Sequence, residues 1–328
     1  MAVARVGNPI GVSCAVCDGG RAGRLTCMAN PTGEQFELTR GNARAVVTEV
    51  GAGLRAFEIN GIPYVDPFEA TDEVPKAAGQ VLLPWPNRTE NACWTFEGRT
   101  QQLEVTEPAR GNAIHGLVRH REWQLLEHAE SSITFEIDIV DEPGWPVPLN
   151  ARINYQLAPH ELTITHQVRN EGESEIGFGV GMHPYFRIGD TPTDELVLTL
   201  GAARVRPFDA AYRVPFDSEQ QVDGTEYDLR TGRQLSGVEW DTAFTELSAG
   251  TDGRYHHQLA EGTTTVDVWT DADFRWVQVF TPQDLNGRGR AVAVEPMTCP
   301  ADALNTGDDL ITIAPAETWR AQWGVRVY

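Results

Sequence analysis

The sequence predicts an all-β protein built as one large antiparallel β-sandwich, and three observations support this fold class. Short segments with alternating apolar and polar residues, rich in β-branched and aromatic side chains, follow one another through most of the chain. The 31 glycines and 20 prolines are spread between these segments, as in antiparallel meanders. Long stretches with the helical spacing of apolar residues are missing. A single sandwich domain with long loops accounts for all three observations.

Ten segments carry the strand pattern. In chain order they are residues 44–51, 53–61, 93–105, 133–140, 151–158, 161–170, 195–200, 264–270, 275–281 and 311–327. A further apolar run, Ala291–Val294, leads into Glu295 and Pro296. Because proline has no N–H to donate, we expect regular pairing to stop near Pro296 and to leave Glu295 half-withdrawn from water at the strand end. Desolvation there would raise the pKa of the carboxyl group into a range useful for proton transfer.

The first part of the chain lacks either kind of periodicity. Patterned sequence begins just after Met28, so we expect residues 1–33 to form a disordered extension and residues 34–328 to form the sandwich domain. The extension holds Cys14 and Cys17 in a C-x-x-C spacing, but no second pair and no histidine cluster completes a zinc site. We interpret these cysteines as reduced thiols and expect no metal.

The charge balance argues against two classes of partner. Lys and Arg number 26 against 47 Asp and Glu, a formal net charge of −21. Such a surface repels phosphate backbones and anionic lipids, so we expect neither nucleic acid nor a membrane as partner. No apolar stretch has the length of a membrane span or of a signal peptide, which favours a cytoplasmic location. A neutral small molecule fits this composition better.

Two of the eight histidines stand apart. His115 lies in a turn-rich stretch, and His183 follows a glycine-rich strand and precedes Tyr185. Each could be a core or loop histidine held by a carbonyl group, or part of a site. We expect His166 to lie on an exposed strand face. We expect the remaining histidines to be solvated: His120, His128, His160, His256 and His257.

Two further segments suggest a carbohydrate ligand. Trp85, Asn87 and Arg88 combine an aromatic ring with an amide and a forked donor, which suits a sugar ring and its hydroxyl groups. A structural turn, with Arg88 paired to a carboxylate, is the alternative. Asp241 precedes an apolar strand and either accepts hydrogen bonds from two vicinal hydroxyls or is an ordinary turn residue.

Taken in order, five motifs resemble those of the bacterial branch of the aldose 1-epimerase (galactose mutarotase-like) family. They are PNR at 86–88, IHG at 114–116, HPYF at 183–186, DTAFTEL at 241–247 and VEPMTCPADALN at 294–305. HPYF and the last motif are specific in combination, and the resemblance covers residue 34 to the end. It implies a large antiparallel super-β-sandwich that interconverts the anomers of free aldoses without a cofactor. We expect a monomer or a homodimer.

The resemblance also implies a role for each site residue. Glu295 matches the general base at the anomeric hydroxyl, and His183 the general acid at the ring oxygen. His115 matches the histidine that orients the sugar. Arg88 and Asp241 match the family's hydroxyl-binding residues, with Asn87 as a lining residue beside them. After Arg88 many family members have an apolar residue and a glycine, whereas this chain has neither. The difference bears on the shape of this loop and on the preferred sugar.

Two alternatives remain at this point. A hexose-6-phosphate 1-epimerase on the same fold would need two or three cations at the far end of the cleft, and Arg119 and Arg187 are candidates. A non-catalytic sugar-binding protein is the other alternative. It would have no use for an acid–base pair such as Glu295 and His183.

Removal of residues 1–27, so that the chain starts at Met28, should leave both thermal unfolding and catalytic activity unchanged, because that segment has no apolar pattern to pack. Calorimetry and polarimetric mutarotation assays of the truncated and full-length chains test this. An inactive or unfolded truncated chain would show that the segment packs on the domain.

Overall fold

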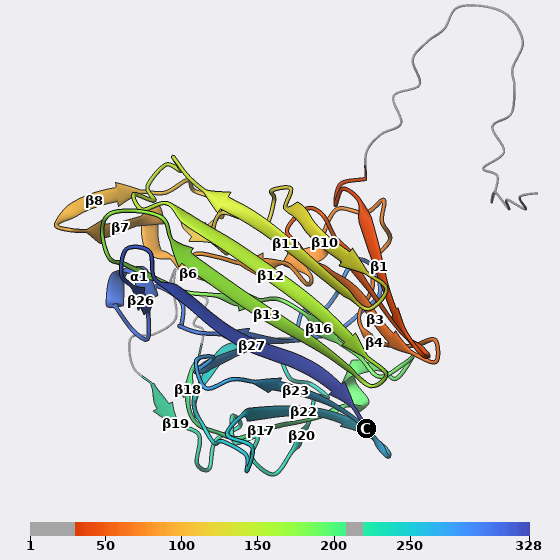
Figure 1. The fold of residues 1–328 in the computed structure, drawn as a ribbon. Helices are drawn as coiled ribbons and strands as arrows, with labels where there is room; N and C mark the ends of the chain where they lie inside the picture. Colours follow the sequence, from red (N-terminus) through yellow and green to blue (C-terminus); the bar gives the residue numbers. More distant parts are fainter. Residues whose placement is uncertain (1–29, 208–218) are drawn as a thin grey trace, which may run out of the picture.

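The computed structural model describes residues 30–207 and 219–328, and its regular structure is almost entirely β-strand (Figure 1). The strands form two large antiparallel sheets and three small two-stranded ones. This confirms the all-β, antiparallel fold class that the alternating segments predicted.

The larger sheet has twelve strands, in the order β1-β2-β3-β4-β16-β25-β24-β21-β18-β19, while β15 pairs with both β25 and β5. Its strands are β1 (Gln35–Arg40), β2 (Ala43–Thr48), β3 (Leu54–Ile59), β4 (Ile62–Val65), β5 (Val81–Leu82), β15 (Gly181–Met182), β16 (Tyr185–Phe186), β18 (Ala202–Arg206), β19 (Gln220–Gln221), β21 (Asp241–Leu247), β24 (Trp276–Phe280) and β25 (Val292–Met297).

The second sheet has nine strands, in the order β10-β11-β12-β13-β27-β23-β22-β17-β20, and spreads across the front of the molecule in Figure 1. Its strands are β10 (Gln124–Ala129), β11 (Ser132–Ile139), β12 (Leu149–Ala158), β13 (Glu161–Asn170), β17 (Val197–Leu200), β20 (Arg233–Gln234), β22 (Tyr255–Glu261), β23 (Thr264–Thr270) and β27 (Thr318–Val327).

Short elements connect the sheets. The two-stranded sheets pair β6 (Arg88–Thr89) with β9 (Ala113–Ile114), β7 (Cys93–Phe96) with β8 (Arg99–Gln102), and β14 (Ile176–Phe178) with β26 (Ile311–Ile313). The helical elements are α1 (Ala303–Thr306) and the 3₁₀ turns η1 (Pro75–Ala77), η2 (Glu90–Ala92) and η3 (Thr193–Glu195). Within the part of the chain that the structure describes, no helix has the length and apolar character to span a membrane.

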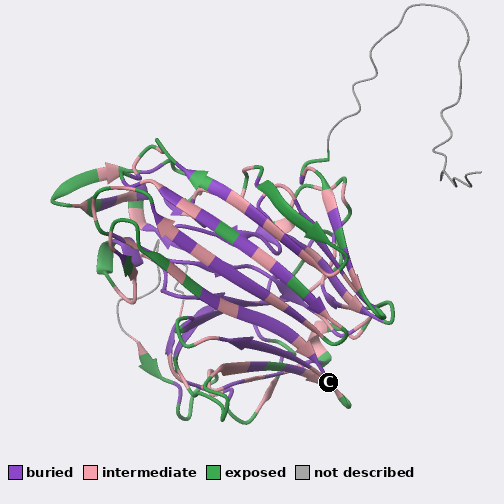
Figure 2. Cartoon of the chain, viewed as in Figure 1, coloured by how far each residue is buried: buried purple, intermediate pink, exposed green. Residues whose placement is uncertain are grey.

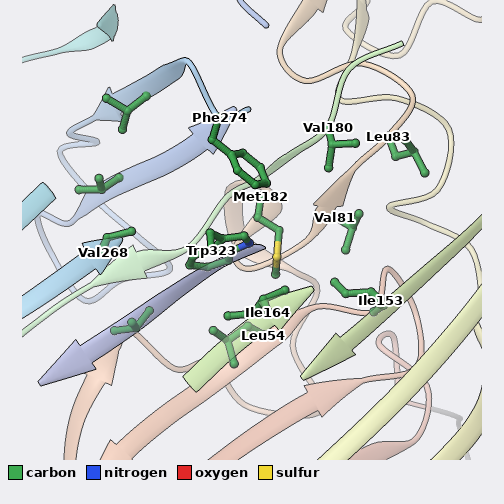
Figure 3. Packing of buried hydrophobic residues seen from close by; sticks show 14 of the residues in the cluster. Leu54, Val81, Leu83, Ile153, Ile164, Val180, Met182, Val268, Phe274 and Trp323 are labelled. Atoms are coloured by element: carbon green, nitrogen blue, oxygen red, sulfur yellow. The ribbon is translucent and has the colours of Figure 1, made fainter. Parts of the chain in front are cut away.

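The core lies between the sheets. Alternate residues of β11 and β12 are buried, so each strand turns one face inward, and Figure 2 shows this alternation of buried and more exposed positions. Figure 3 shows Leu54 and Val81 of the larger sheet in the same cluster as Ile153, Ile164 and Trp323 of the smaller one. The apolar alternation in the sequence is therefore the inner surface of a sandwich.

Two predicted segments contain more than one strand. Residues 93–105 form the hairpin β7–β8, and residues 311–327 are divided into β26 and β27. The division occurs around Pro315 and Ala316, where Ala316 has a left-handed φ of 64°. A residue with this backbone conformation cannot continue an extended strand.

The expected strand end at Pro296 is wrong. β25 runs through Pro296 to Met297, and Pro296 has a register partner, Val277, on β24. On the other side of β25, no strand residue is paired with positions 294–296, because β15 ends and β16 begins there. A ladder interrupted on one side tolerates the missing N–H. Glu295 therefore lies inside a central strand and is buried rather than half-withdrawn from water.

Two histidines expected to contact water are buried instead. His166 in β13 accepts a hydrogen bond of 3.2 Å from Trp323 Nε1. His257 in β22 is also enclosed in the core. Burial lowers the pKa of each ring to about 3, because the charged form loses its hydration. Both are neutral core residues at neutral pH.

Most of the predicted extension, residues 1–29 with Cys14 and Cys17, lies outside the described residues. Residues 30–33 are described, and the Thr32 carbonyl accepts a hydrogen bond of 3.1 Å from the Val50 N–H. The division of the chain at residues 33 and 34 stays a prediction.

A Gly324→Ala substitution should destabilise the sandwich, because Gly324 lies in β27 where Trp269 covers the backbone. A Cβ atom there would lie 2.6 Å from Trp269 Cζ2 and 2.7 Å from the Leu162 carbonyl oxygen. Overpacking of this kind costs roughly 1–3 kcal/mol, which chemical denaturation can measure. Gly201→Ala is the control, since its Cβ would have no atom nearer than 3.5 Å. Equal stability of the two variants would contradict the prediction.

Candidate active site

One cavity brings together the six site residues that the family motifs marked: Asn87, Arg88, His115, His183, Asp241 and Glu295. Its volume is about 320 Å³, a size suited to a small molecule. Its walls are Lys76, Ala77, Asn87, Arg88, Glu107, Ile114, His115, Arg119, His183, Asp241, Phe280 and Glu295. These residues come from separate segments that the larger sheet and the β6–β9 pair bring together.

The break between β15 and β16 brings His183 close to Glu295. β15 pairs with β25 at Met297 and β16 pairs with β25 at Ala293, while Glu295 lies midway between these positions. His183 occupies the break, and its Nε2 lies 3.4 Å from Glu295 Oε1. Two potential proton-transfer groups therefore meet in the middle of the sheet rather than in a loop.

Close packing holds the His183 ring. The Tyr185 ring stacks on it at a centroid distance of 5.0 Å and an interplanar angle of 26°. Before His183 the chain is glycine-rich, and a Cβ on Gly179 would lie 2.2 Å from Cys299 Sγ and 2.9 Å from Pro86 Cδ. The glycine allows the segment to approach its neighbours this closely.

Burial shifts the pKa values of this pair in opposite directions. Glu295 is 2% exposed, and desolvation, helped by the nearby Asp241 charge, raises the pKa of its carboxyl group well above the usual value. Desolvation lowers the pKa of His183 to about 3. A dry environment therefore favours a neutral imidazole and a neutral carboxylic acid. Glu295 Oε2 and His183 Nδ1 have no hydrogen-bond partner among the described residues.

His115 is fixed as a hydrogen-bond donor. The Asn87 backbone N–H donates to His115 Nδ1 at 3.2 Å, and the His115 backbone N–H donates to the Asn87 carbonyl at 2.8 Å. Because Nδ1 accepts, the proton of the neutral ring is on Nε2. Desolvation holds the pKa of His115 well below its usual range, and the positive charges of Arg119 and Arg88 lower it further. The ring is thus neutral and presents an N–H donor at neutral pH.

Arg88 is the centre of a charged network on another wall. Its Nε and Nη2 atoms donate to Glu107 at 2.9 and 3.1 Å, and its Nη1 lies 3.5 Å from Asp241 Oδ2. Gln278 donates to Asp241 Oδ1 at 2.6 Å, and Gln278 is also the register partner of Glu295 on β24. Arg88, Asp241 and Glu295 are therefore fixed relative to one another through adjacent strands.

The sequence interpretation missed some features of the cavity. Glu107, which no motif marks, lies against Arg88; burial alone would raise its pKa, but the hydrogen bonds and charges of Arg88 and Arg110 lower it. Trp85 does not line the cavity: its ring is 2% exposed and lies 6.2 Å from the Trp145 ring in the core. The interpretation of Trp85 as a sugar-stacking ring is wrong.

Comparison with known proteins identifies the family. The family model described as "Aldose 1-epimerase" matches residues 34–326. The chain belongs to the aldose 1-epimerase family. Two Escherichia coli K12 relatives, the uncharacterized proteins YihR and YphB, are similar to it. YihR is 30% identical over 88% of this chain and 92% of its own length, and YphB is 24% identical over 89% and 98%.

Solved structures have the same fold. A GalM/aldose epimerase homologue from C. elegans matches with a TM-score of 0.78 and 17% identity over 90% of this chain and 98% of its own. A galactose 1-epimerase from Lactobacillus acidophilus matches with a TM-score of 0.73 and 17% identity over 88% and 92%. At these identities the likeness shows that this family member has the galactose mutarotase-like sandwich that the motifs predicted.

The described residues of this family member contain no candidate metal site. No three His, Cys, Asp or Glu side chains of residues 30–207 and 219–328 are grouped as metal ligands would be. Cys93 and Cys299 are present there as free thiols.

Glu295→Gln should make the protein more stable than the wild type, increasingly so as the pH rises. Because the folded-state pKa of Glu295 lies above the usual value of 4.5, its protonated form stabilises the fold fully below that value, and this stabilisation is lost as the pH rises through the folded pKa. Glutamine keeps the neutral shape at every pH. The difference in melting temperature between variant and wild type should therefore grow between pH 4 and pH 8. Glu195→Gln, on the exposed surface, is the control, and a difference independent of pH would contradict the assignment.

Proposed function

We propose that this protein is a cofactor-independent aldose 1-epimerase that interconverts the α and β anomers of free aldohexoses such as glucose or galactose. The observation that carries the proposal is the buried Glu295–His183 pair, with 3.4 Å between Oε1 and Nε2 at the wall of a cavity of about 320 Å³. Binding a sugar does not require a dry acid–base pair, whereas opening its ring does.

Mutarotation needs one proton removed and another supplied. Glu295 takes the proton of the C1 hydroxyl, the C1–O1 bond becomes a carbonyl, the C1–O5 bond breaks, and His183 gives its proton to O5. The open aldehyde turns about the C1–C2 bond, and the same steps in reverse close the ring on the other face. Glu295 and His183 together hold one transferable proton before and after each step, so the cycle has no net uptake or release of protons.

Burial determines where that proton rests. In the empty cavity the raised pKa of Glu295 and the lowered pKa of His183 place it on the carboxyl group. This is the state that the cycle reaches after ring opening. For a cyclic sugar to react, the proton moves across the 3.4 Å contact to His183, and the sugar hydroxyl donates to the carboxylate. The partnerless Glu295 Oε2 is a suitable acceptor.

The remaining residues hold the sugar. His115 presents an Nε2–H donor in a fixed direction. Asp241, kept in place by Arg88 and Gln278, accepts from hydroxyl groups away from C1, and Arg88 binds hydroxyl groups beside it. Asn87 supports both His115 and Arg88, since its side-chain oxygen accepts from the Arg88 N–H at 2.9 Å. A grip on the distant hydroxyls leaves C1 free to rotate.

Glu295→Gln and His183→Asn should each lower kcat by at least about 10²-fold, the usual contribution of a positioned proton-transfer group. Polarimetric decay of freshly dissolved α-glucose, corrected for the spontaneous rate, measures this, and calorimetry shows whether sugar still binds. Glu195→Gln and His160→Asn are the matched controls, because both side chains are exposed. A Glu295→Gln enzyme with near wild-type rate would rule out the mechanism.

The pH dependence of wild-type activity should be bell-shaped, with both limbs set by the titration of Glu295 and His183. Activity requires Glu295 and His183 together to hold one transferable proton. The rate should therefore fall at acid pH, where His183, with a pKa of about 3, is protonated while Glu295 is also protonated. It falls on the basic side as Glu295 loses its proton above its raised pKa. The basic limb should therefore be absent from the residual activity of Glu295→Gln. A basic limb that persists in that variant would assign it to another group.

A further inference from the structure

Glu107 is a carboxylate of the cavity wall to which the proposed mechanism gives no role. Protein donors occupy both of its side-chain oxygens. Oε1 accepts from Arg88 Nη2 at 3.1 Å and from Arg110 Nη1 at 2.6 Å. Oε2 accepts from Arg88 Nε at 2.9 Å and from Asn112 Nδ2 at 3.4 Å. Because a carboxylate offers about four acceptor positions, Glu107 has little capacity left for a sugar hydroxyl. Its influence on the site passes through its partners.

The most important of these partners is Arg88, which is buried. Its Nε and Nη2 atoms both face the Glu107 carboxylate, the paired geometry in which a guanidinium group is held most firmly. Since the group is planar, this contact also fixes the direction of its third nitrogen. Nη1 lies 3.4 Å from Asn87 Oδ1 and 3.5 Å from Asp241 Oδ2. The pairing with Glu107 therefore turns Nη1 toward the proposed hydroxyl-binding side of the cavity.

The loop that carries Glu107 is held by backbone groups. The Glu107 N–H donates to the Asn112 carbonyl at 2.9 Å, and the Glu107 carbonyl accepts from the Gly111 N–H at 2.9 Å. Asn112 is buried, and its Oδ1 accepts from the Asn91 N–H at 3.2 Å. A side-chain substitution at residue 107 leaves these backbone hydrogen bonds intact. The Glu107 carboxylate thus extends from a fixed point, and it can be altered without opening the loop.

The charges around Glu107 alternate in sign. Burial alone would raise the pKa of Glu107, but the hydrogen bonds and charges of Arg88 and Arg110 lower it, so the side chain is an anion at neutral pH. From the partly exposed end inward the order is Arg110, Glu107, Arg88 and Asp241. Without the Glu107 charge, the Arg88 guanidinium group would be drawn onto Asp241, the carboxylate on its other side.

We infer that Glu107 is a positioning residue of the sugar site: it holds Arg88 so that neither Arg88 Nη1 nor the Asp241 carboxylate is used up in a full ion pair between them. Both groups then remain available to sugar hydroxyls. This rests on the proposed epimerase function. There, Arg88 and Asp241 bind hydroxyl groups that do not react, so the loss of Glu107 should weaken ground-state and transition-state binding alike.

Glu107→Gln should therefore raise KM for glucose roughly tenfold, the worth of a hydrogen bond to a charged group, with a much smaller change in kcat. Polarimetric mutarotation at varied glucose concentration measures both constants. Glu107→Asp keeps the charge on a shorter side chain and should restore part of the affinity. Glu104→Gln is the matched control, because it removes the same charge from an exposed position of the same loop. An unchanged KM in a Glu107→Gln enzyme that melts like the wild type would overturn the inference.

A double-mutant cycle separates positioning from direct sugar binding. If Glu107 acts through Arg88, adding Glu107→Gln to an Arg88→Ala enzyme should cause no further rise in KM. Additive effects of the two substitutions would show that Glu107 itself binds the sugar, and the positioning role would fail.

The pH dependence gives a second readout that a purely structural role would not move. Burial is the main cause of the raised pKa of Glu295; the Asp241 charge adds to it and the Arg88 charge opposes it. A guanidinium group drawn onto Asp241 cancels more of the Asp241 contribution, so the pKa of Glu295 falls. The basic limb of the activity profile should therefore shift to lower pH in Glu107→Gln and stay in place in Glu104→Gln. A shift to higher pH would contradict the expected movement of Arg88.

NMR of the ¹⁵N-labelled protein tests the geometry without any assay of activity. The Arg88 Nε–H signal, assigned by its absence from Arg88→Ala, should exchange with water more slowly in the wild type than in Glu107→Gln, because Glu107 accepts its hydrogen bond. Equal exchange in both proteins would overturn the pairing on which the inference depends. If the signal behaves as expected but wild-type enzyme does not accelerate mutarotation, the proposed function fails instead.

Discussion

The break between β15 and β16, opposite Glu295, is the constraint on which the site depends. β25 is a central strand, so a carboxyl group in it is cut off from water by neighbouring strands. At positions 294–296 one neighbour is missing, and His183 takes its place. The same gap tolerates Pro296 and admits the cavity. Regular pairing along the whole of β25 would leave no room for the imidazole beside Glu295.

This arrangement has a cost in stability that the rest of the sandwich must offset. Glu295 and His183 each keep a buried polar atom without a partner, and such atoms cost roughly 1–3 kcal/mol apiece. Four residues of the cavity wall, Lys76, Ala77, Asn87 and His115, also have left-handed φ angles between 45° and 64°. Non-glycine residues adopt this conformation rarely, and they do so mostly where function or a tight turn requires it. The extensive core between the sheets supplies the compensation.

Charge is distributed differently inside and outside the cavity. The chain as a whole is strongly acidic, at −21, yet in the cavity Glu107 and Asp241 lie against Arg88, and the raised pKa of Glu295 favours its neutral carboxylic acid. Overall acidity argues against polyanions as partners, but it does not describe the charges within the few ångströms of the cavity.

The sequence by itself determined the fold class and the identity of the six motif residues in the cavity. Strict alternation, as in residues 151–158, permits one buried face and so predicts a strand, and specific motifs name Glu295 and His183 without any geometry. It could not reveal that His166 and His257 are buried, because polar neighbours along a strand say nothing about what packs on its face. Nor could it place Glu107 in the cavity, choose Arg119 over Arg187 as a cavity residue, or remove Trp85 from the cavity.

Only the tertiary structure decided those positions and the protonation of the pair. The pKa of a buried group depends on how much water and charge its surroundings hold, and the surroundings of Glu295 come from β24, β16, Asp241 and Arg88, which lie far from it in the chain. Local sequence predicts strands because side-chain direction alternates with each residue. It does not determine electrostatics here, because desolvation is a property of neighbours that only the folded sheets bring together.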